Sequence, residues 1–181
     1  MSINYIEQYK IDLKICDDLI SYFKEKNEYK ASGMTSFNTI RYDVKKSTDV
    51  CVFNNSNDQR IKNFFMALTT CIQPYCKKYE LKHRVKTELC NNIQHYKAGE
   101  GYFATHYERD SISSSTRELA YMVYLNTLTD KGGTFFPRHK KTIEPIKGKT
   151  VIWPAGFTHP HRGVISPTQE KYIATGWFVI Q

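Results

Sequence analysis

Seven short segments rich in β-branched and aromatic residues follow one another from residue 87 to the end of the chain. Gly, Pro, Asn and Asp separate them, which is the pattern of strands divided by turns. Many short strands without intervening helices indicate an antiparallel sandwich or barrel and not an alternating α/β sheet. We therefore predict an α+β fold that is mainly β. The segments are TELCNNIQHY, GYFATHYE, LAYMVYLNTL, GTFFP, KTIEPI, KTVIWPA and KYIATGWFVI.

Two amphipathic helices are predicted before these strands. The first covers residues 12–23, where Asp12 is a suitable N-cap and apolar residues follow at helical spacing. The second extends from about residue 58 to 78, and Pro74 is expected to kink or tighten its last turns.

The domain organisation follows from this division. Residues 1–85 are expected to form a mostly helical buttress, and residues 86–181 the β core. No Gly-, Pro- or Ser-rich linker separates the halves, so we predict a single domain over residues 1–181.

Composition excludes several classes of protein. The chain has 40% hydrophobic residues, which is too many for a disordered chain, and no run of about 18 apolar residues that would span a membrane. Its net charge of +8 favours partners or substrates of opposite sign. The five cysteines form no tandem C-x-x-C pairs, and their odd number argues against a disulfide framework. With no secretory segment at the N-terminus, we predict a soluble cytoplasmic protein from a reducing compartment.

Two histidine clusters lie in the β half. His106 and Glu108 are two residues apart, so on a strand they project from the same face. His159 and His161 follow the segment KTVIWPA. Two imidazoles and one carboxylate form the facial triad suited to non-haem Fe(II). By spacing alone, His-x-Glu is weak evidence, and a polar pair on the surface or across two strands is its commoner explanation.

A series of further motifs surrounds these clusters. In chain order they are Gln94-His95-Tyr96-Lys97-Ala98-Gly99-Glu100-Gly101-Tyr102, His106-x-Glu108, Arg117, Tyr124-Leu125-Asn126, Gly132-Gly133-Thr134-x-Phe136-Pro137, Pro145-x-Lys147-Gly148, Trp153-Pro154, His161-x-Gly163, Lys171-Tyr172 and Trp177. In order and spacing, this series resembles the Fe(II)- and 2-oxoglutarate-dependent dioxygenases of the prolyl 4-hydroxylase-like family. The resemblance covers roughly half of the chain, and it implies a double-stranded β-helix, or jelly roll, with the metal at one open end.

The resemblance also assigns the iron ligands. His106 and Glu108 match the first two, and His161 matches the third. His161 fits better than His159 because Lys171 lies ten residues after it, where the family places the basic residue that binds the far carboxylate of 2-oxoglutarate. Lys171 would neutralise that buried charge.

Other positions match the walls of the family's pocket. Tyr96, Tyr124 and Thr134 are expected to line the co-substrate site and to donate hydrogen bonds to its carboxylate. Three residues are expected near the substrate, with Trp177 on the strand beside the iron: Arg117, Arg162 and Trp177.

The chain departs from the family at one ligand. The usual carboxylate is Asp, whereas Glu108 stands here, and its extra methylene shifts the ligating oxygen. Glu supplies the same charge and donor type, so the site is expected to be retained. Asp110 is the alternative ligand, since it lies on the same face of the predicted strand.

The function implied is hydroxylation of an unactivated C–H bond with Fe(II), 2-oxoglutarate and O2, releasing succinate and CO2. The expected substrate is a prolyl or similar side chain of a peptide or protein, or a small molecule. Oxidation of a nucleotide or nucleic-acid base is a less favoured alternative, and the basic segment 138–141 is either a rim for an acidic partner or a solvated loop. A non-catalytic metal-binding jelly roll is the alternative from another class, and no membrane partner is expected.

Overall fold

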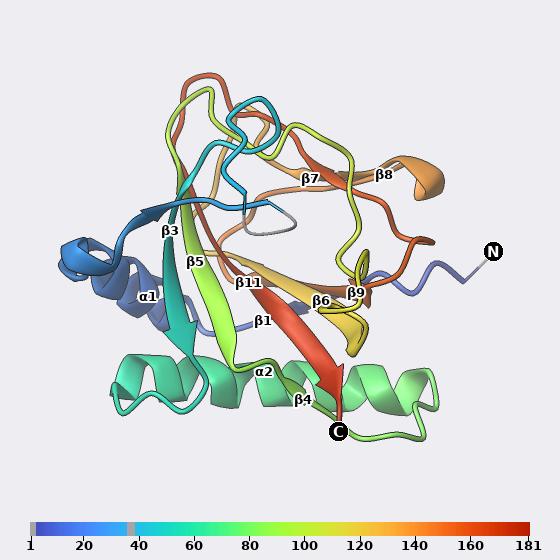
Figure 1. The fold of residues 1–181 in the computed structure, drawn as a ribbon. Helices are drawn as coiled ribbons and strands as arrows, with labels where there is room; N and C mark the ends of the chain where they lie inside the picture. The colour runs from blue at the N-terminus through green and yellow to red at the C-terminus, as the bar shows by residue number, and fades with distance from the viewer. Residues whose placement is uncertain (1–2, 36–38) are drawn as a thin grey trace.

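Two antiparallel sheets make up most of the structure (Figure 1), a computed structural model that describes residues 3–35 and 39–181. The larger sheet has the strand order β1-β9-β6-β11-β5-β3-β2, with β4 also paired to β11, and the smaller has the order β10-β7-β8. The strands of the larger sheet are β1 (Glu7–Lys10), β2 (Ala31–Ser32), β3 (Thr48–Phe53), β4 (Val85–Thr87), β5 (Cys90–Tyr96), β6 (Arg117–Tyr124), β9 (Lys149–Pro154) and β11 (Lys171–Ile180). Those of the smaller sheet are β7 (Thr134–Phe136), β8 (Lys141–Ile143) and β10 (Arg162–Gly163). The prediction of a mainly β fold is therefore confirmed.

Both predicted helices are present. Helix α1 (Leu13–Glu25) begins after Asp12, whose side chain accepts a hydrogen bond from the backbone N–H of Lys14. Helix α2 (Gln59–Lys78) begins in the same way after Asp58 and continues through Pro74 to its last turn. Short 3-10 helices, η1 (Asn27–Tyr29) and η3 (Pro137–His139), complete the helical elements of the described chain.

The first 85 residues are not mostly helical, and that prediction is wrong. Strand β1 pairs with β9, and β3 pairs with β5 along its whole length, so both belong to the larger sheet. Val50 and Val52 of β3 are buried, whereas the residues between and beside them are partly exposed. Alternating burial is typical of a strand, but six residues are too few for the alternation to stand out in the sequence.

The predicted strand over GYFATHYE is also wrong. The segment makes isolated bridges, one between Lys45 and Tyr102 and one between His106 and His161. Its backbone N–H groups bond to different parts of the chain, so no single neighbouring strand forms a ladder with it; the N–H of Glu108, for example, donates to the carbonyl of Ala155.

The larger sheet separates two hydrophobic cores. On β6, Leu119, Tyr121 and Val123 face a core shared with both helices, whereas Ala120, Met122 and Tyr124 face a second core shared with the smaller sheet. Helices and small sheet thus cover opposite faces of the larger sheet (Figure 1). Burial on both faces explains the nearly continuous apolar sequence of this strand.

One cysteine pair departs from the expected reduced state. Cys51 on β3 and Cys90 on β5 form a disulfide, with Cα atoms 6.0 Å apart. The pairing of these two strands, which the sequence analysis does not predict, brings the two residues together. Cys16, Cys71 and Cys76 are free thiols.

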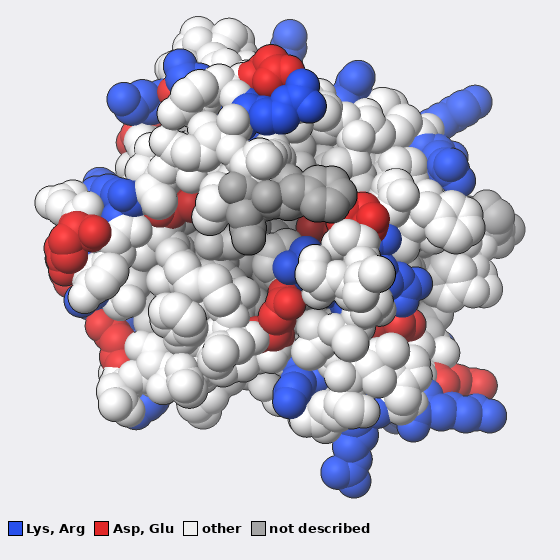
Figure 2. Space-filling view, in the orientation of Figure 1, with Lys and Arg blue, Asp and Glu red and all other residues white. Residues whose placement is uncertain are grey.

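The charged surface is dispersed. Lys and Arg are scattered over the face shown in Figure 2, which is hollowed near its centre with acidic side chains beside the hollow. Among the residues described, no helix combines the length and the apolar character needed to cross a bilayer.

Helix α2 should contribute strongly to stability through its buried face. Leu68 is fully buried in the helix-side core, so Leu68→Ala should lower the free energy of unfolding by about 2–5 kcal/mol. Met66 lies on the same helix but is 67% exposed, so Met66→Ala should change the free energy of unfolding by less than about 0.5 kcal/mol. Urea unfolding of both variants measures the difference, and equal losses would contradict the packing described.

Candidate active site

A cavity of about 630 Å³ opens on the face of the larger sheet that lies away from the helices. Strand β11 provides its floor, because Lys171, Ile173, Thr175 and Trp177 alternate with residues that face the helices. Lys171 and Trp177 are six residues apart on this extended strand, which corresponds to a distance of roughly 20 Å. The cavity therefore has a deep end near Lys171 and a second end near Trp177.

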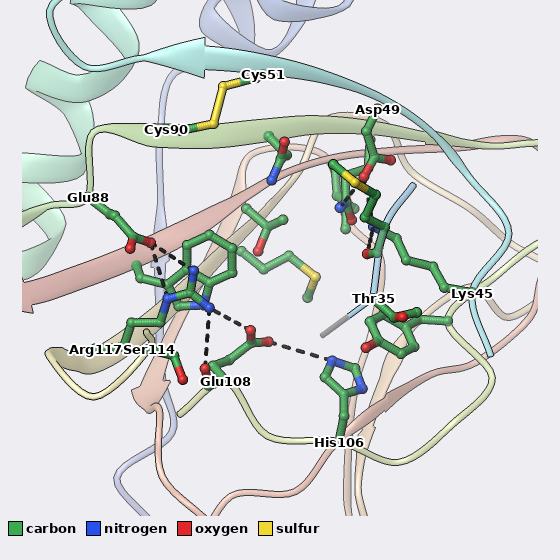
Figure 3. A pocket seen from close by; sticks show the side chains of 18 of the residues that line it. Thr35, Lys45, Asp49, Cys51, Glu88, Cys90, His106, Glu108, Ser114 and Arg117 are labelled. Atoms are coloured by element: carbon green, nitrogen blue, oxygen red, sulfur yellow. Dashed lines mark hydrogen bonds and ion pairs between the residues drawn. A yellow bond between two sulfur atoms is a disulfide. The ribbon is translucent and has the colours of Figure 1, made fainter. Parts of the chain in front are cut away.

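Three side chains come together beside this floor: His106, Glu108 and His161. Their ligating atoms all lie within 4.8 Å of one another. Glu108 Oε1 is 3.1 Å from His161 Nε2 and 3.6 Å from His106 Nε2. In Figure 3, Glu108 points towards His106, which lies two residues before it in the same stretch of chain. The bridge between residues 106 and 161 holds the two segments together by paired backbone hydrogen bonds.

The backbone sets the orientation of both imidazoles. His106 Nδ1 lies 3.0 Å from the carbonyl of Ala104, and His161 Nδ1 lies 3.0 Å from that of His159. Because a carbonyl only accepts, each Nδ1 donates to its carbonyl, and each Nε2 faces Glu108 as the ring atom left for a metal ion. The ring of Tyr102 stacks on His106 at 3.6 Å between centroids. The rings are thus held as metal ligands usually are.

The electrostatics of the cluster favour the ligating forms. Burial and the nearby His161 lower the pKa of His106, which keeps its imidazole neutral. Burial alone would raise the pKa of Glu108, but its interactions with the side chains of His106 and His161 outweigh burial and hold this pKa well below its usual range. A neutral imidazole and an ionised carboxylate are the states that bind a metal ion.

The donor set fits Fe(II). Two imidazole nitrogens and one carboxylate oxygen on one side of a cavity form the 2-His-1-carboxylate arrangement, with the remaining side open to small molecules. The other candidate ligands lie outside the cluster. The ring of His159 stacks on His139, and its Nε2 bonds to the carbonyl of Asn4. Asp110 also lines the cavity but is not part of the group.

Lys171 lies at the deep end as a buried ammonium group, with a residue exposure of 5%. Its Nζ donates to the carbonyl of Gly132 at 3.2 Å and lies 4.8 Å from the ring centroid of Tyr96. Within residues 3–35 and 39–181, no carboxylate forms an ion pair with it. Burial lowers the pKa of Lys171 to about 8. An uncompensated buried cation is costly, so this end of the cavity fits an anionic ligand such as a carboxylate.

The predicted co-substrate residues have different positions. Tyr96 and Thr134 line the cavity, and Tyr96 donates its hydroxyl proton to Gln94 Oε1 at 2.8 Å. Tyr124 is not among the described residues that line it. Its hydroxyl lies 2.7 Å from Thr134 Oγ1 and is fully buried behind that residue. Tyr124 thus contacts the site through Thr134.

Of the residues predicted to lie near the substrate, some line the cavity and one does not. Arg117 and Trp177 line the cavity, and the Arg117 guanidinium lies 3.5 Å from the Trp177 ring centroid. Arg162 is exposed on β10, packs over Phe135 and is not among the described residues that line the cavity. The basic segment 138–141 is likewise absent from the described lining, which agrees with a solvated loop and not with a rim of this cavity.

Two further polar residues of the cavity were missed by sequence reasoning. Lys45 and Asp49 form an almost fully buried ion pair of 2.7 Å, and Gln94 Nε2 donates to the same carboxylate oxygen at 2.9 Å. Both charged residues line the cavity. Their sequence carries no recognisable motif, since the pairing of β3 with β5 brings Asp49 to this wall and an isolated bridge to Tyr102 holds Lys45 beside it.

Comparison with known proteins places this site in a family. Residues 91–179 match the profile of the 2OG-Fe(II) oxygenase superfamily. No curated protein sequence matches the chain.

Solved structures share the fold. A prolyl 4-hydroxylase from Pseudomonas putida is similar with a TM-score of 0.78 and 16% identity over 97% of this chain and 93% of that one. The collagen prolyl hydroxylase of Paramecium bursaria Chlorella virus-1, solved with 2-oxoglutarate, has a TM-score of 0.71 and 20% identity over 96% and 95%. The prolyl hydroxylase of Trichoplax adhaerens, solved with a hypoxia-inducible-factor peptide fragment, has a TM-score of 0.76 and 14% identity over 97% and 84%.

The buried ammonium should make stability depend on pH. The folded-state pKa of Lys171, about 8, is below its usual 10.5, so the unfolded chain binds more protons between these values. The stability of the ligand-free wild type relative to Lys171→Met should therefore rise from pH 8 to 10.5, with a slope approaching about 1.4 kcal/mol per pH unit. Urea unfolding across this range measures it. Lys86→Met, at an exposed position on β4, is the control and should show no such slope.

Proposed function

Because the chain belongs to the 2OG-Fe(II) oxygenase superfamily, we propose that it hydroxylates a prolyl or similar side chain of a peptide or protein, with release of succinate and CO2. As a 2-oxoglutarate-dependent dioxygenase, it uses Fe(II), 2-oxoglutarate and O2. We further propose that its two sheets are the halves of a double-stranded β-helix and that His106, Glu108 and His161 hold the iron.

The observation that carries this proposal is the position of Lys171. A buried ammonium without a carboxylate partner among the described residues lines the same cavity as the His-Glu-His cluster. A structural metal site has no need of a buried cation at the far end of its cavity. A co-substrate with two carboxylates, one near the metal and one distant, accounts for both features.

Each group of the chain then has a defined task. Bound Fe(II) supplies the redox chemistry by which O2 and 2-oxoglutarate oxidise a C–H bond. The two imidazoles and Glu108 bind the metal on one side. Lys171 neutralises the far carboxylate of 2-oxoglutarate, and Thr134 supplies a hydroxyl at the same end of the cavity. Tyr96 packs beside the ammonium and excludes water from it.

The opening of the cavity supports an apolar substrate side chain. Four residues that line the cavity are also exposed and carry large apolar or aromatic groups: Tyr29, Met34, Leu89 and Tyr107. A prolyl ring fits such a rim. The loop over residues 110–116 contributes several serines to the lining, and Ser114 holds it in a turn by accepting from the N–H groups of Asp110 and Ser111. Among the described residues, no basic cluster lies at the rim, which disfavours nucleic acid.

The ligand assignment is tested by metal binding. His106→Ala and His161→Ala should each abolish the visible band of the anaerobic Fe(II)–2-oxoglutarate complex, and with it succinate formation after O2 is admitted. His159→Gln changes the neighbouring imidazole, which lies outside the cluster, and should retain both signals. Correctly folded wild-type protein that shows neither signal would remove the oxygenase assignment.

The co-substrate assignment is tested separately. Lys171→Met should raise the apparent Kd for 2-oxoglutarate by about 100-fold or more, since one partner of a buried ion pair is lost. Fe(II) affinity should be retained, because Lys171 does not belong to the cluster. Titration of 2-oxoglutarate into the Fe(II)-loaded protein measures the change, with Lys86→Met as control. An unchanged Kd would refute the role of Lys171.

A further inference from the structure

The two oxygens of the Glu108 carboxylate face different partners. Oε1 faces the imidazole nitrogens of His106 and His161. Oε2 instead accepts a hydrogen bond of 2.8 Å from the indole N–H of Trp177. An N–H donor to an ionised carboxylate makes a charge-assisted bond, which is stronger than a bond between neutral groups. The indole therefore determines which oxygen is presented to the histidines.

Glu108 has particular need of such a partner. Glutamate has one more rotatable bond than aspartate, and each free torsion adds entropy that must be lost when the carboxylate is fixed. Moreover, Glu108 lies in an irregular segment and not on a strand, so no ladder fixes its backbone on both sides. The bond to Trp177 supplies the restraint that a regular strand would otherwise provide.

Trp177 is itself held from several sides. It lies on β11 opposite Ala120 of β6, and its carbonyl accepts from the N–H of Glu88. Arg117 covers its ring, donates to Glu88 Oε2 through Nε at 3.2 Å, and donates to the carbonyl of Glu108 through Nη1 at 3.3 Å. Figure 3 shows Arg117 between Glu88 and Glu108. We call Glu88, Arg117 and Trp177 the carboxylate clamp.

We propose that Trp177, held within the carboxylate clamp, is a positioning residue that orients Glu108 for metal binding. The proposal rests on the proposed iron site, and it gives Trp177 and Arg117 a role other than contact with substrate. The single polar hydrogen of the indole is already used by Glu108. The clamp reaches both the side chain and the backbone of the ligand, so it restrains position as well as rotation.

The test is the affinity of the apo protein for Co(II), a spectroscopic substitute for Fe(II) that needs no turnover. Trp177→Phe keeps an aromatic ring over which Arg117 can stack, but it removes the N–H. It should raise the Kd for Co(II) by about 10- to 100-fold, the usual effect of losing a partner of a metal ligand. It should also alter the visible Co(II) spectrum. An unchanged Kd and spectrum would overturn the proposal.

A further variant separates positioning from packing. Trp153→Phe removes the same atoms beside the same cluster, because Trp153 packs on His161 but its N–H has no hydrogen-bond partner among the described residues. It should lower thermal stability yet raise the Kd for Co(II) clearly less than Trp177→Phe. Equal increases in Kd would assign the effect to packing and overturn the proposal.

A double-mutant cycle provides the sharper measurement. Glu108→Asp withdraws the carboxylate from the indole by one methylene, so Trp177→Phe should cost less than about threefold in Co(II) affinity in the Glu108→Asp background. The same 10- to 100-fold loss in both backgrounds would show that Trp177 acts independently of Glu108, against the proposal. If the wild type itself binds no Co(II), the metal site fails, whereas binding by all variants with equal Kd contradicts only the positioning role.

Discussion

The pairing of β11 with β5 and β6 is the interaction on which the rest of the structure depends. Strand β11 lies near the middle of the larger sheet, and its side chains alternate between the helix-side core and the cavity. Lys171 and Trp177 are six residues apart and therefore share the cavity face. One extended strand thus places the buried cation of Lys171 and the partner of Glu108 at fixed, opposite ends of one pocket.

The unfavourable free energy of this arrangement comes mainly from burying charged groups. Lys171 is buried without a carboxylate partner among the described residues, and burial depresses its pKa. The ligand-free protein therefore carries an electrostatic penalty that an anionic co-substrate relieves on binding. Glu108 differs from Lys171, since its Oε1 lies close to the imidazoles of His106 and His161 and its Oε2 accepts from Trp177. Under the proposed assignment, the ligands are already oriented for the metal, whereas the charge of Lys171 is neutralised only when the co-substrate binds.

Sequence reasoning succeeded where local rules decide structure. The caps Asp12 and Asp58 and the apolar spacing behind them located both helices, because capping and amphipathic burial act within a few residues. It failed for β3 and for the segment around His106. A strand of six residues carries little signal, and GYFATHYE has strand-like composition although its hydrogen bonds go to several separate segments.

The sequence by itself determined the types of group and their order: His106, Glu108 and His161 as candidate ligands, with Lys171 ten residues beyond the last. Only the tertiary structure decided which of these groups meet and what supports them. Trp177 reaches Glu108 across 69 residues of chain. Hydrogen bonds of this kind depend on atoms being within about 3 Å in space, and the tertiary fold, which sequence spacing does not encode, brings them there.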